Sequence, residues 1–470
     1  MKHHTSPHSP QTVAVLYRIQ VLLGIAAGLS YVVAAVAVVL TGIAPAKYLI
    51  PVLVVASIGV LVLVRASLRK HTSLRRKIVV ITLSLLVALA STYIYSAARS
   101  LSSFLSDVQA SDTYETYSIV AEKDRNVRLD TAKTAGLLGN DPYIADVEKA
   151  LAEKTAAAPK RYDDTTSTIL ALESKRLDTG VFSSATMGLL EENYAKFDTL
   201  EVLATFRIKV KGEQAADVDT TKPFAIYISG IDTYGDVAKV SRSDVNMLMI
   251  VNPVQHKILL VNTPRDYYVQ LHGTKGTRDK LTHAGVYGID MSRQTLEDLY
   301  GIPIDNYVRI NFSSLVNMVD TIGGVDVYSE YAFKSFRQGQ NHLNGTQALT
   351  FSRERYSFSA GDRQRGRNQQ LVIEAIVSKL SQPSVAVKYQ SILQSLKGTL
   401  QTNISSSTLA GFANAQLNDM RGWYVESISV DGTGKMAPTY SMGAQLLYVM
   451  EPDTKSVETA KTAIRDYLAE

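Results

Sequence analysis

The sequence contains no cysteine, little net charge and few histidines. Without cysteine the chain can form no disulfide, no thiol nucleophile, and no zinc or iron–sulfur centre bound through cysteine. The net charge is +5 over 470 residues, so no strong basic field indicates nucleic acid as a partner. A helix-turn-helix pattern with a basic recognition helix is also missing, which argues against a transcriptional regulator. A bacterial cell-envelope protein with an ordinary packed core is compatible with all of these absences.

Charge is nearly absent from three apolar stretches in the first hundred residues. These stretches are "VLLGIAAGLSYVVAAVAVVL" (21–40), "YLIPVLVVASIGVLVLV" (48–64) and "IVVITLSLLVALASTYIY" (78–95). About 20 apolar residues suffice for a helix to cross a bilayer. The first stretch is too long for the core of a signal peptide and lacks a clear cleavage site. We therefore predict a membrane region over residues 1–100, with three transmembrane helices at about 16–42, 48–64 and 78–98.

A basic loop separates the second and third stretches and indicates the orientation of the chain. In "RASLRKHTSLRRK" (65–77) six residues are lysine or arginine and none is acidic. By the positive-inside rule this loop and the N-terminus lie in the cytoplasm, and the chain after about residue 100 lies outside. A domain outside the cell has no ATP supply and no chromosome, so we expect its substrates to be envelope components, including membrane lipid.

The stretch 101–215 combines strand and helix patterns without a cluster of catalytic side chains, so we predict an extracellular accessory α/β domain. Its first helix is expected in "DPYIADVEKALAEKTAA", capped by Asp141 and with proline at its first position. A second helix is expected in "SSATMGLLEENYAKF", capped by Ser183 or Ser184. A polar stretch with glycine and proline then marks the boundary to residues 216–470.

Residues 216–470 are predicted to form a catalytic α/β domain whose central mixed sheet is covered by helices. Apolar runs indicate strands in "FAIYISGID", "NMLMIVN" and "KILLVNT", the last two joined by a turn at Asn252-Pro253. Helical spacing and glycine stops indicate helices in "SRQTLEDLYG", "NFSSLVNMVDTIGG" and "QLVIEAIVSKL". The part from about 384 onward is interpreted as completing this domain, with helices in "VKYQSILQSLKGTL" and "SSSTLAGFANAQL" and a strand in "GWYVESISVDG".

Charged side chains gather at the ends of the three predicted strands. Asp232 follows the first strand, Arg242 and Asp244 precede the second, and Arg265 and Asp266 follow the third. Strand ends are where the ligand-binding groups of such sheets collect. Two carboxylates at neighbouring strand ends suit magnesium, which takes one or two carboxylates together with water and phosphate oxygens. Arginine side chains bind phosphate oxygens in pairs and keep their charge at any working pH.

The segment "TFSRERYSFSAGDRQRGRNQQ" (350–370) holds five arginines but only two acids. A solvated, flexible loop is one interpretation of such a run. The other interpretation is a site for a ligand with several negative charges. Two of these arginines and the strand-end residues together describe a magnesium–pyrophosphate site made of Asp232, Asp244, Arg242, Arg265, Arg353 and Arg355. None of these fragments is specific alone, and only their combination carries the interpretation.

Six motifs occur along the chain in a fixed order. They are "SGID", "SRSDVNMLMI", "NTPRD", "INFSSLVNMVDTIGGVDV", "LNGTQALTFSRER" and "GDRQRGRNQQ". As an ordered set they resemble the LytR–CpsA–Psr family over about 224–380, and the three membrane spans with the region after them resemble its capsule-associated streptococcal branch. The resemblance implies an α/β/α sandwich with an apolar pocket for a polyprenyl tail. It also implies a magnesium-dependent phosphotransferase that moves a glycopolymer, here a capsular polysaccharide, from polyprenyl pyrophosphate to peptidoglycan and releases polyprenyl phosphate.

The resemblance also implies roles for individual residues. It implies that Asp232 and Asp244 bind the metal, which is magnesium or, with the same oxygen ligands, manganese. The pyrophosphate-binding residues that it implies are Arg242, Arg265, Arg353, Arg355, Arg365 and Gln369. The residues expected to act in catalysis are Asp244, Arg265, Arg353 and Arg355. The residues of the apolar pocket stay open, because core and pocket side chains have the same sequence pattern.

One position departs from the pattern of the family. Many members have arginine directly before the glutamine, where this chain has Asn368-Gln369, and Arg367 lies one residue earlier. An arginine contact at that position is therefore in doubt. The helix after the arginine segment is expected to begin near Asn368 or Gln369, with the arginines beside its N-terminus, where phosphate binds favourably. Arg363 and Arg367 are left open between ligand contacts and plain surface residues.

The expected reaction is an in-line attack by a peptidoglycan hydroxyl on the phosphorus next to the sugar. Its proton acceptor is open among Asp244, Asp266 and Asp362, and His283 is expected to be structural. Two alternatives remain: a pyrophosphatase that only hydrolyses the lipid pyrophosphate, and a lipid-binding scaffold or regulator that docks with the capsule synthesis machinery. The sequence identifies neither the glycan nor the acceptor sugar, and it gives no role for the accessory domain and no oligomeric state.

Overall fold

The computed structural model describes residues 10–70, 72–107, 113–210, 217–232, 240–382 and 400–469, with Val385, Ile392 and Ser395. The chain divides into two compact units, Met1–Ser106 with Ser406–Met420, and Asp107–Ser405 with Arg421–Glu470. The domain boundary predicted at 215–216 lies outside the described residues, and so does most of the helix predicted in "VKYQSILQSLKGTL".

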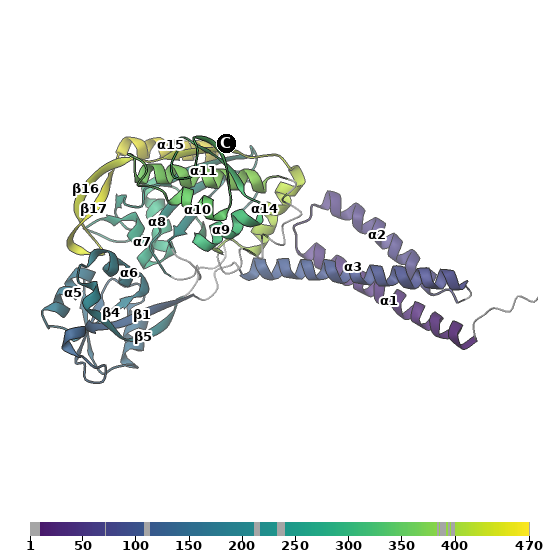
Figure 1. The fold of residues 1–470 in the computed structure, drawn as a ribbon, viewed down its shortest axis with the longest axis horizontal. Coiled ribbons are helices and arrows are strands. Elements are labelled where there is room, and N and C mark those ends of the chain that lie inside the picture. Colours follow the sequence, from purple (N-terminus) through teal and green to yellow (C-terminus); the bar gives the residue numbers. More distant parts are fainter. Residues whose placement is uncertain are drawn as a thin grey trace, which may run out of the picture. The chain divides into compact units, whose positions relative to one another are not determined.

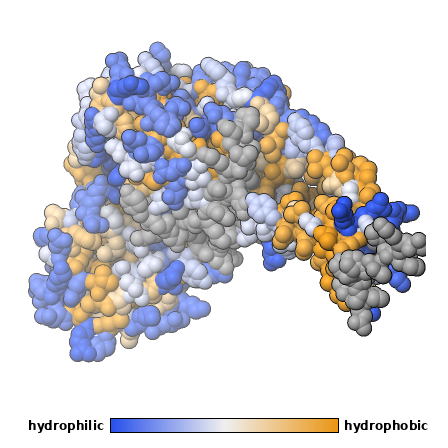
Figure 2. Space-filling model, turned by 45° about the vertical axis from the view of Figure 1, so that its right-hand side comes forward, coloured by the Kyte–Doolittle hydropathy of each residue, from blue (hydrophilic) through white to orange (hydrophobic). Residues whose placement is uncertain are grey.

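The first unit contains three long apolar helices, α1 (Pro10–Leu40), α2 (Ala46–Ser67) and α3 (Leu74–Asp107) (Figure 1). Each is long and apolar enough to cross a membrane, as predicted, and α3 runs beyond the predicted end near residue 98. Leu22, Leu61 and Leu89, one from each helix, are 69, 68 and 67% exposed. Figure 2 shows the hydrophobic surface over these helices. So large an apolar surface is suited to lipid rather than to water.

A fourth helix, α14 (Ser406–Asp419), belongs to the same unit although it comes late in the sequence. The side chain of Asn414 donates to the carbonyl oxygen of Gly42 at 3.0 Å, and Lys47 Nζ donates to the carbonyl oxygen of Asn418. The sequence pattern of α14 favours a place in the catalytic domain, whereas its contacts group it with the apolar helices. The sequence pattern predicts that this helix forms, but it does not predict which elements of the chain the helix packs against.

The second unit begins with a five-stranded sheet in the order β3-β2-β4-β1-β5. Its strands are β1 (Thr113–Glu122), β2 (Thr134–Leu138), β3 (Ala158–Tyr162), β4 (Thr179–Ser183) and β5 (Leu200–Val210). Its helices are α4 (Ile144–Ala152), α5 (Thr165–Glu173) and α6 (Ser184–Asn193). β1 is antiparallel to β4 and β5, and β2 is parallel to β3 and β4. We call this α/β portion the accessory region.

The two predicted helix caps in the accessory region differ in outcome. Ser183 caps α6 as predicted, because its hydroxyl oxygen accepts from the backbone nitrogen of Thr186 at 3.1 Å. Asp141 does not cap α4, which begins three residues later, so that prediction is wrong. Its carboxylate instead accepts from the backbone nitrogen of Tyr143 at 2.8 Å and from the hydroxyl of Tyr117 at 2.9 Å. These bonds hold a turn that precedes the helix.

A six-stranded sheet in the order β14-β11-β6-β7-β8-β15 forms the centre of the predicted catalytic domain. Its strands are β6 (Phe224–Ile231), β7 (Val245–Asn252), β8 (Lys257–Thr263), β11 (Asn306–Asn311), β14 (Leu400–Thr402) and β15 (Tyr424–Ser429). β6, β7 and β8 are antiparallel neighbours, and β7 and β8 form the predicted hairpin. β11 is parallel to β6 and β15 is parallel to β8, so the sheet is mixed, as predicted.

Helices cover both faces of this sheet and complete an α/β/α sandwich (Figure 1). The longer helices of this part are α8 (Ile289–Tyr300), α9 (Phe312–Thr321), α10 (Gly345–Arg353), α11 (Asp362–Leu380) and α15 (Thr454–Ala469). One face packs against α8 and α15 through side chains such as Leu296 and Ile464. The other face packs against α11 through Ile373 and Val377. Shorter elements are β9 (Tyr268–Val269), β10 (Asp279–Lys280), α7 (Leu281–Ala284), β12 (Val325–Ser329), β13 (Gly339–Leu343), β16 (Gly432–Thr439) and β17 (Gly443–Pro452).

Candidate functional site

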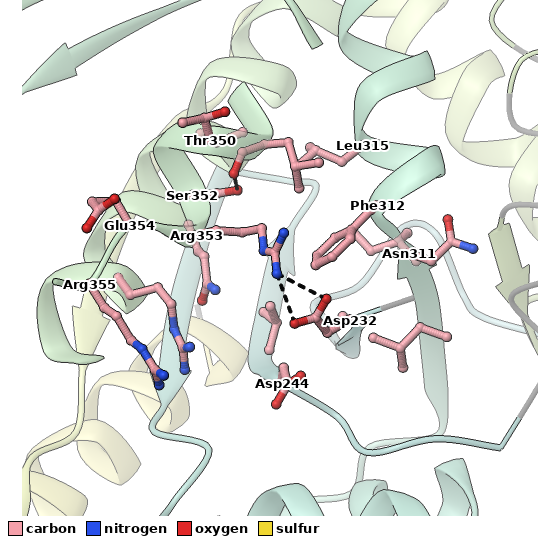
Figure 3. Close-up of a pocket in the computed structure, with 18 of the residues that line it drawn as sticks. Asp232, Asp244, Asn311, Phe312, Leu315, Thr350, Ser352, Arg353, Glu354 and Arg355 are labelled. Carbon is pink, nitrogen blue, oxygen red and sulfur yellow. Dashed lines mark hydrogen bonds and ion pairs between the residues drawn. The ribbon is translucent and has the colours of Figure 1, made fainter. Parts of the chain in front are cut away.

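A cavity of about 690 Å³ lies at the edge of the six-stranded sheet where β6 ends and β7 begins. Side chains of α9, α10 and α11 form its other walls (Figure 3). All eight site residues predicted from the sequence line it: Asp232, Arg242, Asp244, Arg265, Arg353, Arg355, Arg365 and Gln369. Because β6, β7 and β8 alternate in direction, the end of β6, the start of β7 and the end of β8 meet at one edge of the sheet.

The two aspartates of the cavity each face an arginine. The two carboxylate oxygens of Asp232 accept from Arg353 Nη2 at 3.3 and 3.2 Å (Figure 3). Asp244 Oδ1 accepts from Arg265 Nη1 at 2.8 Å. Burial raises the pKa of Asp232 and the charge of Asp244 raises it further, although Arg353 opposes the shift. The site therefore holds two like charges close together, and neighbouring cations offset their repulsion.

Arg265 is held between two carboxylates. Its Nη1 lies 2.8 Å from Asp244 Oδ1, and its Nε lies 3.8 Å from Asp266 Oδ2. Lys280 Nζ pairs with the other oxygen of Asp266 at 2.9 Å and so fixes that carboxylate. Burial alone would lower the pKa of Arg265, but the charges of Asp244 and Asp266 outweigh burial and raise it. Arg265 is therefore a permanent cation in a fixed position.

Arg353 and Arg355 lie on either side of a buried acid. Helix α10 ends at Arg353, whose guanidinium lies 4.2 Å from the ring centre of Phe312, and the guanidinium of Arg355 lies 4.6 Å from that of the following tyrosine. Between them, Glu354 is extended and buried and pairs with Lys334, which lowers the pKa of Glu354 to about 2. All three side chains line the cavity, and the ion pair of Glu354 with Lys334 fixes the segment that carries the two arginines.

Helix α11 begins at Asp362, six residues before the predicted start near Asn368, so that prediction is wrong. Its first turns are polar but closely packed. A Cβ atom on Gly366 would lie 2.3 Å from the side-chain nitrogen of Asn262. Asn368 is buried, and its side chain donates to the carbonyl oxygen of Phe351 in α10 at 3.1 Å. Contacts with the rest of the fold therefore stabilise a helical start that apolar periodicity does not indicate.

The five arginines of segment 350–370 have two kinds of role. Three of them line the cavity, namely Arg353, Arg355 and Arg365. Arg363 Nε donates to Asp431 at 2.5 Å, and Arg367 Nε donates to Glu330 at 3.2 Å. These two arginines form ion pairs away from the cavity, which resolves the choice that the sequence leaves open. Gln369 follows Arg365 by four residues on α11, so both lie on the helix face that meets the cavity.

The sequence profile of the LytR_cpsA_psr family matches residues 193–465. This range includes every residue that lines the cavity except Glu192, which belongs to the accessory region. The chain belongs to the LytR_cpsA_psr family. The polyisoprenyl-teichoic acid–peptidoglycan teichoic acid transferase TagU of Bacillus cereus is 32% identical over 232 residues, which are 48% of this chain and 75% of TagU. TagU of Enterococcus faecalis is 34% identical over 229 residues, 47% of this chain and 74% of the relative. The crystal structure of Bacillus subtilis TagV is 27% identical, with a TM-score of 0.45 and coverage of 53% of this chain and 98% of that one.

Of the three predicted proton acceptors in this LytR_cpsA_psr protein, only Asp244 lines the cavity in the described part of the chain. Asp266 is engaged with Lys280, and Asp362 pairs with Arg365. Asp244 itself is paired with an arginine, so every one of the three carboxylates is already held by a cation. Asp244 is the candidate with access to a ligand in the cavity.

His283 is structural, as predicted. It is buried, and its Nδ1 lies 2.7 Å from Asp279 Oδ1 and 2.8 Å from Ser441 Oγ. A Ser–His–Asp relay needs the serine and the aspartate on different ring nitrogens. Here both partners contact the same nitrogen, so the three side chains tie β10 and α7 to the segment between β16 and β17.

Apolar side chains also line the cavity, and the sequence does not identify them. They are Ile228, Ile231, Val245, Ile310, Phe312, Leu315, Leu349, Val372 and Ile373. Ile228 also packs with Met247 in a core cluster of the sheet, so one side chain serves both core and cavity. Three charged residues outside the predicted site also line the cavity, namely Glu192, Lys334 and Glu354. The cavity thus has both charged and apolar side chains in its lining.

The cavity acids fit the predicted metal ion in number and type. The described residues contain no group of three or more histidine, cysteine, aspartate or glutamate side chains placed to hold a metal. Asp232 and Asp244 provide two carboxylates, and magnesium commonly takes one or two, with water and phosphate oxygens completing its shell. Burial and, to a smaller extent, the charge of Asp244 raise the pKa of Asp232, and a divalent cation bound there would stabilise both carboxylates. The donor set fits magnesium together with a phosphate ligand.

Proposed function

We propose that this protein is an envelope phosphotransferase that moves a glycopolymer, specifically a capsular polysaccharide, from polyprenyl pyrophosphate to peptidoglycan. The observation that carries the proposal is the lining of the cavity, which combines five arginines and the carboxylates of Asp232 and Asp244 with apolar side chains. A polyprenyl pyrophosphate has the matching chemistry, a compact polyanion joined to a long apolar chain. The TagU relatives, named as transferases of polyisoprenyl-linked teichoic acid to peptidoglycan, support the same class of reaction.

In the proposed complex the cavity arginines bind the pyrophosphate oxygens. Arg265 and Arg353 are paired with carboxylates in the structure, and a pyrophosphate carries enough charge to share or replace those partners. Asp232 and Asp244 would hold Mg²⁺, or Mn²⁺ with the same oxygen ligands. The bound metal would supply positive charge at the phosphoryl oxygens. The apolar wall would take the first part of the polyprenyl chain and keep water away from it.

The bond changes of the proposed reaction balance without a further reactant. A hydroxyl oxygen of peptidoglycan forms a new bond to the phosphorus that carries the sugar. The bond from that phosphorus to the bridging oxygen breaks, and polyprenyl phosphate leaves with the electron pair. The hydroxyl proton passes to a base; Asp244 is the predicted candidate that lines the cavity, and it can take the proton only through an oxygen that does not hold the metal. Arg265 and Arg353 stabilise charge that develops on the phosphoryl oxygens.

The proposed reaction requires the cavity to lie outside the cell. We predict that alkaline phosphatase fused to the C-terminus is active. By the positive-inside rule the basic loop between α2 and α3 lies in the cytoplasm, and α3 then carries the rest of the chain out of the cell. The same reporter inserted in that loop serves as the control and is expected to be inactive. Activity of the loop fusion alone would place the large domain in the cytoplasm and contradict the proposed reaction.

The decisive assay uses the full-length protein in detergent with polyprenyl-pyrophosphate-linked glycan and peptidoglycan. We expect release of polyprenyl phosphate that depends on Mg²⁺ and is abolished by a chelator. Asp232→Asn and Asp244→Asn are each expected to lower the rate by about 100-fold or more, since each removes a proposed metal ligand. Asp326→Asn is the matched control, because Asp326 is exposed and pairs with His342 outside the cavity.

The products of this assay separate the proposed function from its alternatives. Glycan bonded to peptidoglycan identifies a transferase. Free phosphorylated glycan, formed equally well without peptidoglycan, identifies a pyrophosphatase. Binding of the lipid without release of polyprenyl phosphate, in a folded protein with Mg²⁺ or Mn²⁺, contradicts both enzymatic functions and favours a lipid-binding scaffold.

A further inference from the structure

Helix α6 of the accessory region packs directly on the catalytic domain. Leu189 is fully buried in a cluster with Met442 and Leu447, and Val286 packs against the same cluster. Near the end of α6, the carbonyl oxygen of Asn193 accepts from Gln445 Nε2 at 2.7 Å. The helix is therefore anchored on the catalytic domain by an apolar contact and by a hydrogen bond at its C-terminal end.

A second helix of the accessory region fixes the same contact. The backbone nitrogen of Thr165, at the start of α5, donates to the carbonyl oxygen of Ser441 at 3.1 Å. Thr166 Oγ1 donates to the carbonyl oxygen of Met442 at 2.5 Å. Both acceptors lie in the turn between β16 and β17, the turn whose Met442 contacts Leu189. The positions of α5 and α6 against the catalytic domain are thus set by several independent contacts.

This anchoring places one acid of the accessory region in the cavity. Glu192 follows Leu189 by three residues, so both lie on the same face of α6. The carboxylate of Glu192 forms an ion pair with the guanidinium of Arg242, and both side chains line the cavity. Among the described residues that line the cavity, Glu192 is the only one from the accessory region. Arg242 is one of the arginines expected to bind pyrophosphate.

An ion pair with Glu192 and a bond to phosphate compete for the same guanidinium. Arg242 can give its donors fully to a phosphate oxygen only after it releases Glu192. The negative charge of Glu192 also opposes an anion at the same place, although water weakens the effect because the side chains of Glu192 and Arg242 are 46 and 26% exposed. Asp232 and Asp244 differ from Glu192, because they would keep a cation partner when magnesium and pyrophosphate bind together.

We propose that Glu192 is an internal competitor of the pyrophosphate group, through which the accessory region controls occupancy of the cavity. This inference rests on the proposed function. When the pyrophosphate binds, Arg242 exchanges Glu192 for a phosphate oxygen, and the contact between α6 and the catalytic domain loses its charged component. By linkage, any partner that draws α6 away from the cavity strengthens pyrophosphate binding to the same extent. The accessory region thereby gains a role that its lack of catalytic side chains does not suggest.

The test compares two neighbouring acids of α6 in the full-length protein in detergent. The probe is inorganic pyrophosphate with Mg²⁺, and its dissociation constant is measured by calorimetry. Glu192→Gln is expected to bind pyrophosphate about 3- to 5-fold more tightly than the wild type, the upper part of the range expected when a partly exposed ion pair is removed. The control Glu191→Gln removes the same charge from an exposed residue that forms no ion pair with the described part of the chain. It is expected to stay within about twofold of the wild type.

An Arg242→Gln background tests whether the effect passes through the ion pair. In that background Glu192→Gln is expected to lose most of its gain in binding and to keep only the part due to the charge of Glu192 itself, whereas the effect of a merely structural role of Glu192 would persist in full. Equal constants for Glu192→Gln and Glu191→Gln, or weaker binding by Glu192→Gln, would overturn the inference. If Arg265→Gln still abolishes binding in that case, the proposed function survives. If the wild type and Glu192→Gln both fail to bind pyrophosphate, the inference and the proposed pyrophosphate site fail together.

Discussion

Arg265→Gln is expected to lower the rate of polyprenyl phosphate release by about 100- to 1000-fold, the effect of removing one preorganised charge-stabilising donor. We expect so large an effect because the position of the Arg265 guanidinium is fixed by its neighbours. Its guanidinium is fixed between Asp244 and Asp266, both carboxylates raise its pKa, and its side chain is only 17% exposed. The developing charge on the phosphoryl oxygens would meet this cation without any rearrangement of the protein.

Two matched variants check this expectation. Arg265→Lys keeps the charge but loses the planar fork, so we expect an intermediate rate. Arg363→Gln removes an arginine that pairs with Asp431 outside the cavity, and its rate is expected to stay within about twofold of the wild type. Rates are measured as polyprenyl phosphate released per minute, and thermal unfolding confirms that each variant is folded. A folded Arg265→Gln protein with the wild-type rate would remove Arg265 from the proposed mechanism.

The charged residues at the strand ends of the cavity could be predicted because local patterns determine where they lie. Three short apolar runs, a turn at Asn252-Pro253 and charged residues at the strand ends suffice to predict a hairpin and a shared edge. Because β6, β7 and β8 are antiparallel neighbours, the residues after β6, before β7 and after β8 all lie at the same edge of the sheet. Asp232, Asp244 and Arg265 therefore come together for a reason that is visible in the sequence.

The parts that could not be predicted depend on contacts between distant segments. The start of α11 could not be predicted because its first turns are polar. The packing of Gly366 and Asn368 against other elements stabilises these turns. The apolar wall was hidden because Ile228 has the same pattern as any core residue of β6. Glu192 was hidden because it belongs to a region without catalytic motifs and reaches the cavity only through the packing of α6.

The segment that carries Arg242 and Asp244 is fixed by a close approach to Gly285. A Cβ atom at Gly285 would lie 2.6 Å from the carbonyl oxygen of Ser241 and 2.8 Å from the backbone nitrogen of Ser243. Hydrogen bonds prevent the segment 241–244 from moving away from Gly285. Arg309 Nη2 donates to the same carbonyl oxygen of Ser241 at 3.2 Å, and Ser243 is hydrogen-bonded through its backbone nitrogen and its side chain. A methyl group at this position must therefore displace the backbone that carries both residues.

Gly285→Ala is accordingly expected to destabilise the protein by about 1–3 kcal/mol, as overpacking of a filled interior does. It is also expected to lower the transfer rate by about 100-fold, because displacements of about 1 Å at a catalytic group have effects of that size. Thermal unfolding and the release assay measure the two effects separately. Gly188→Ala is the matched control, since a Cβ atom there meets nothing within 4 Å and alanine favours the helix. If Gly285→Ala keeps both the wild-type stability and the wild-type rate, the position of Arg242 and Asp244 does not depend on this contact. If stability falls while the rate is kept, the displacement of Arg242 and Asp244 does not affect the reaction. That result would contradict the proposal that the reaction depends on their exact positions.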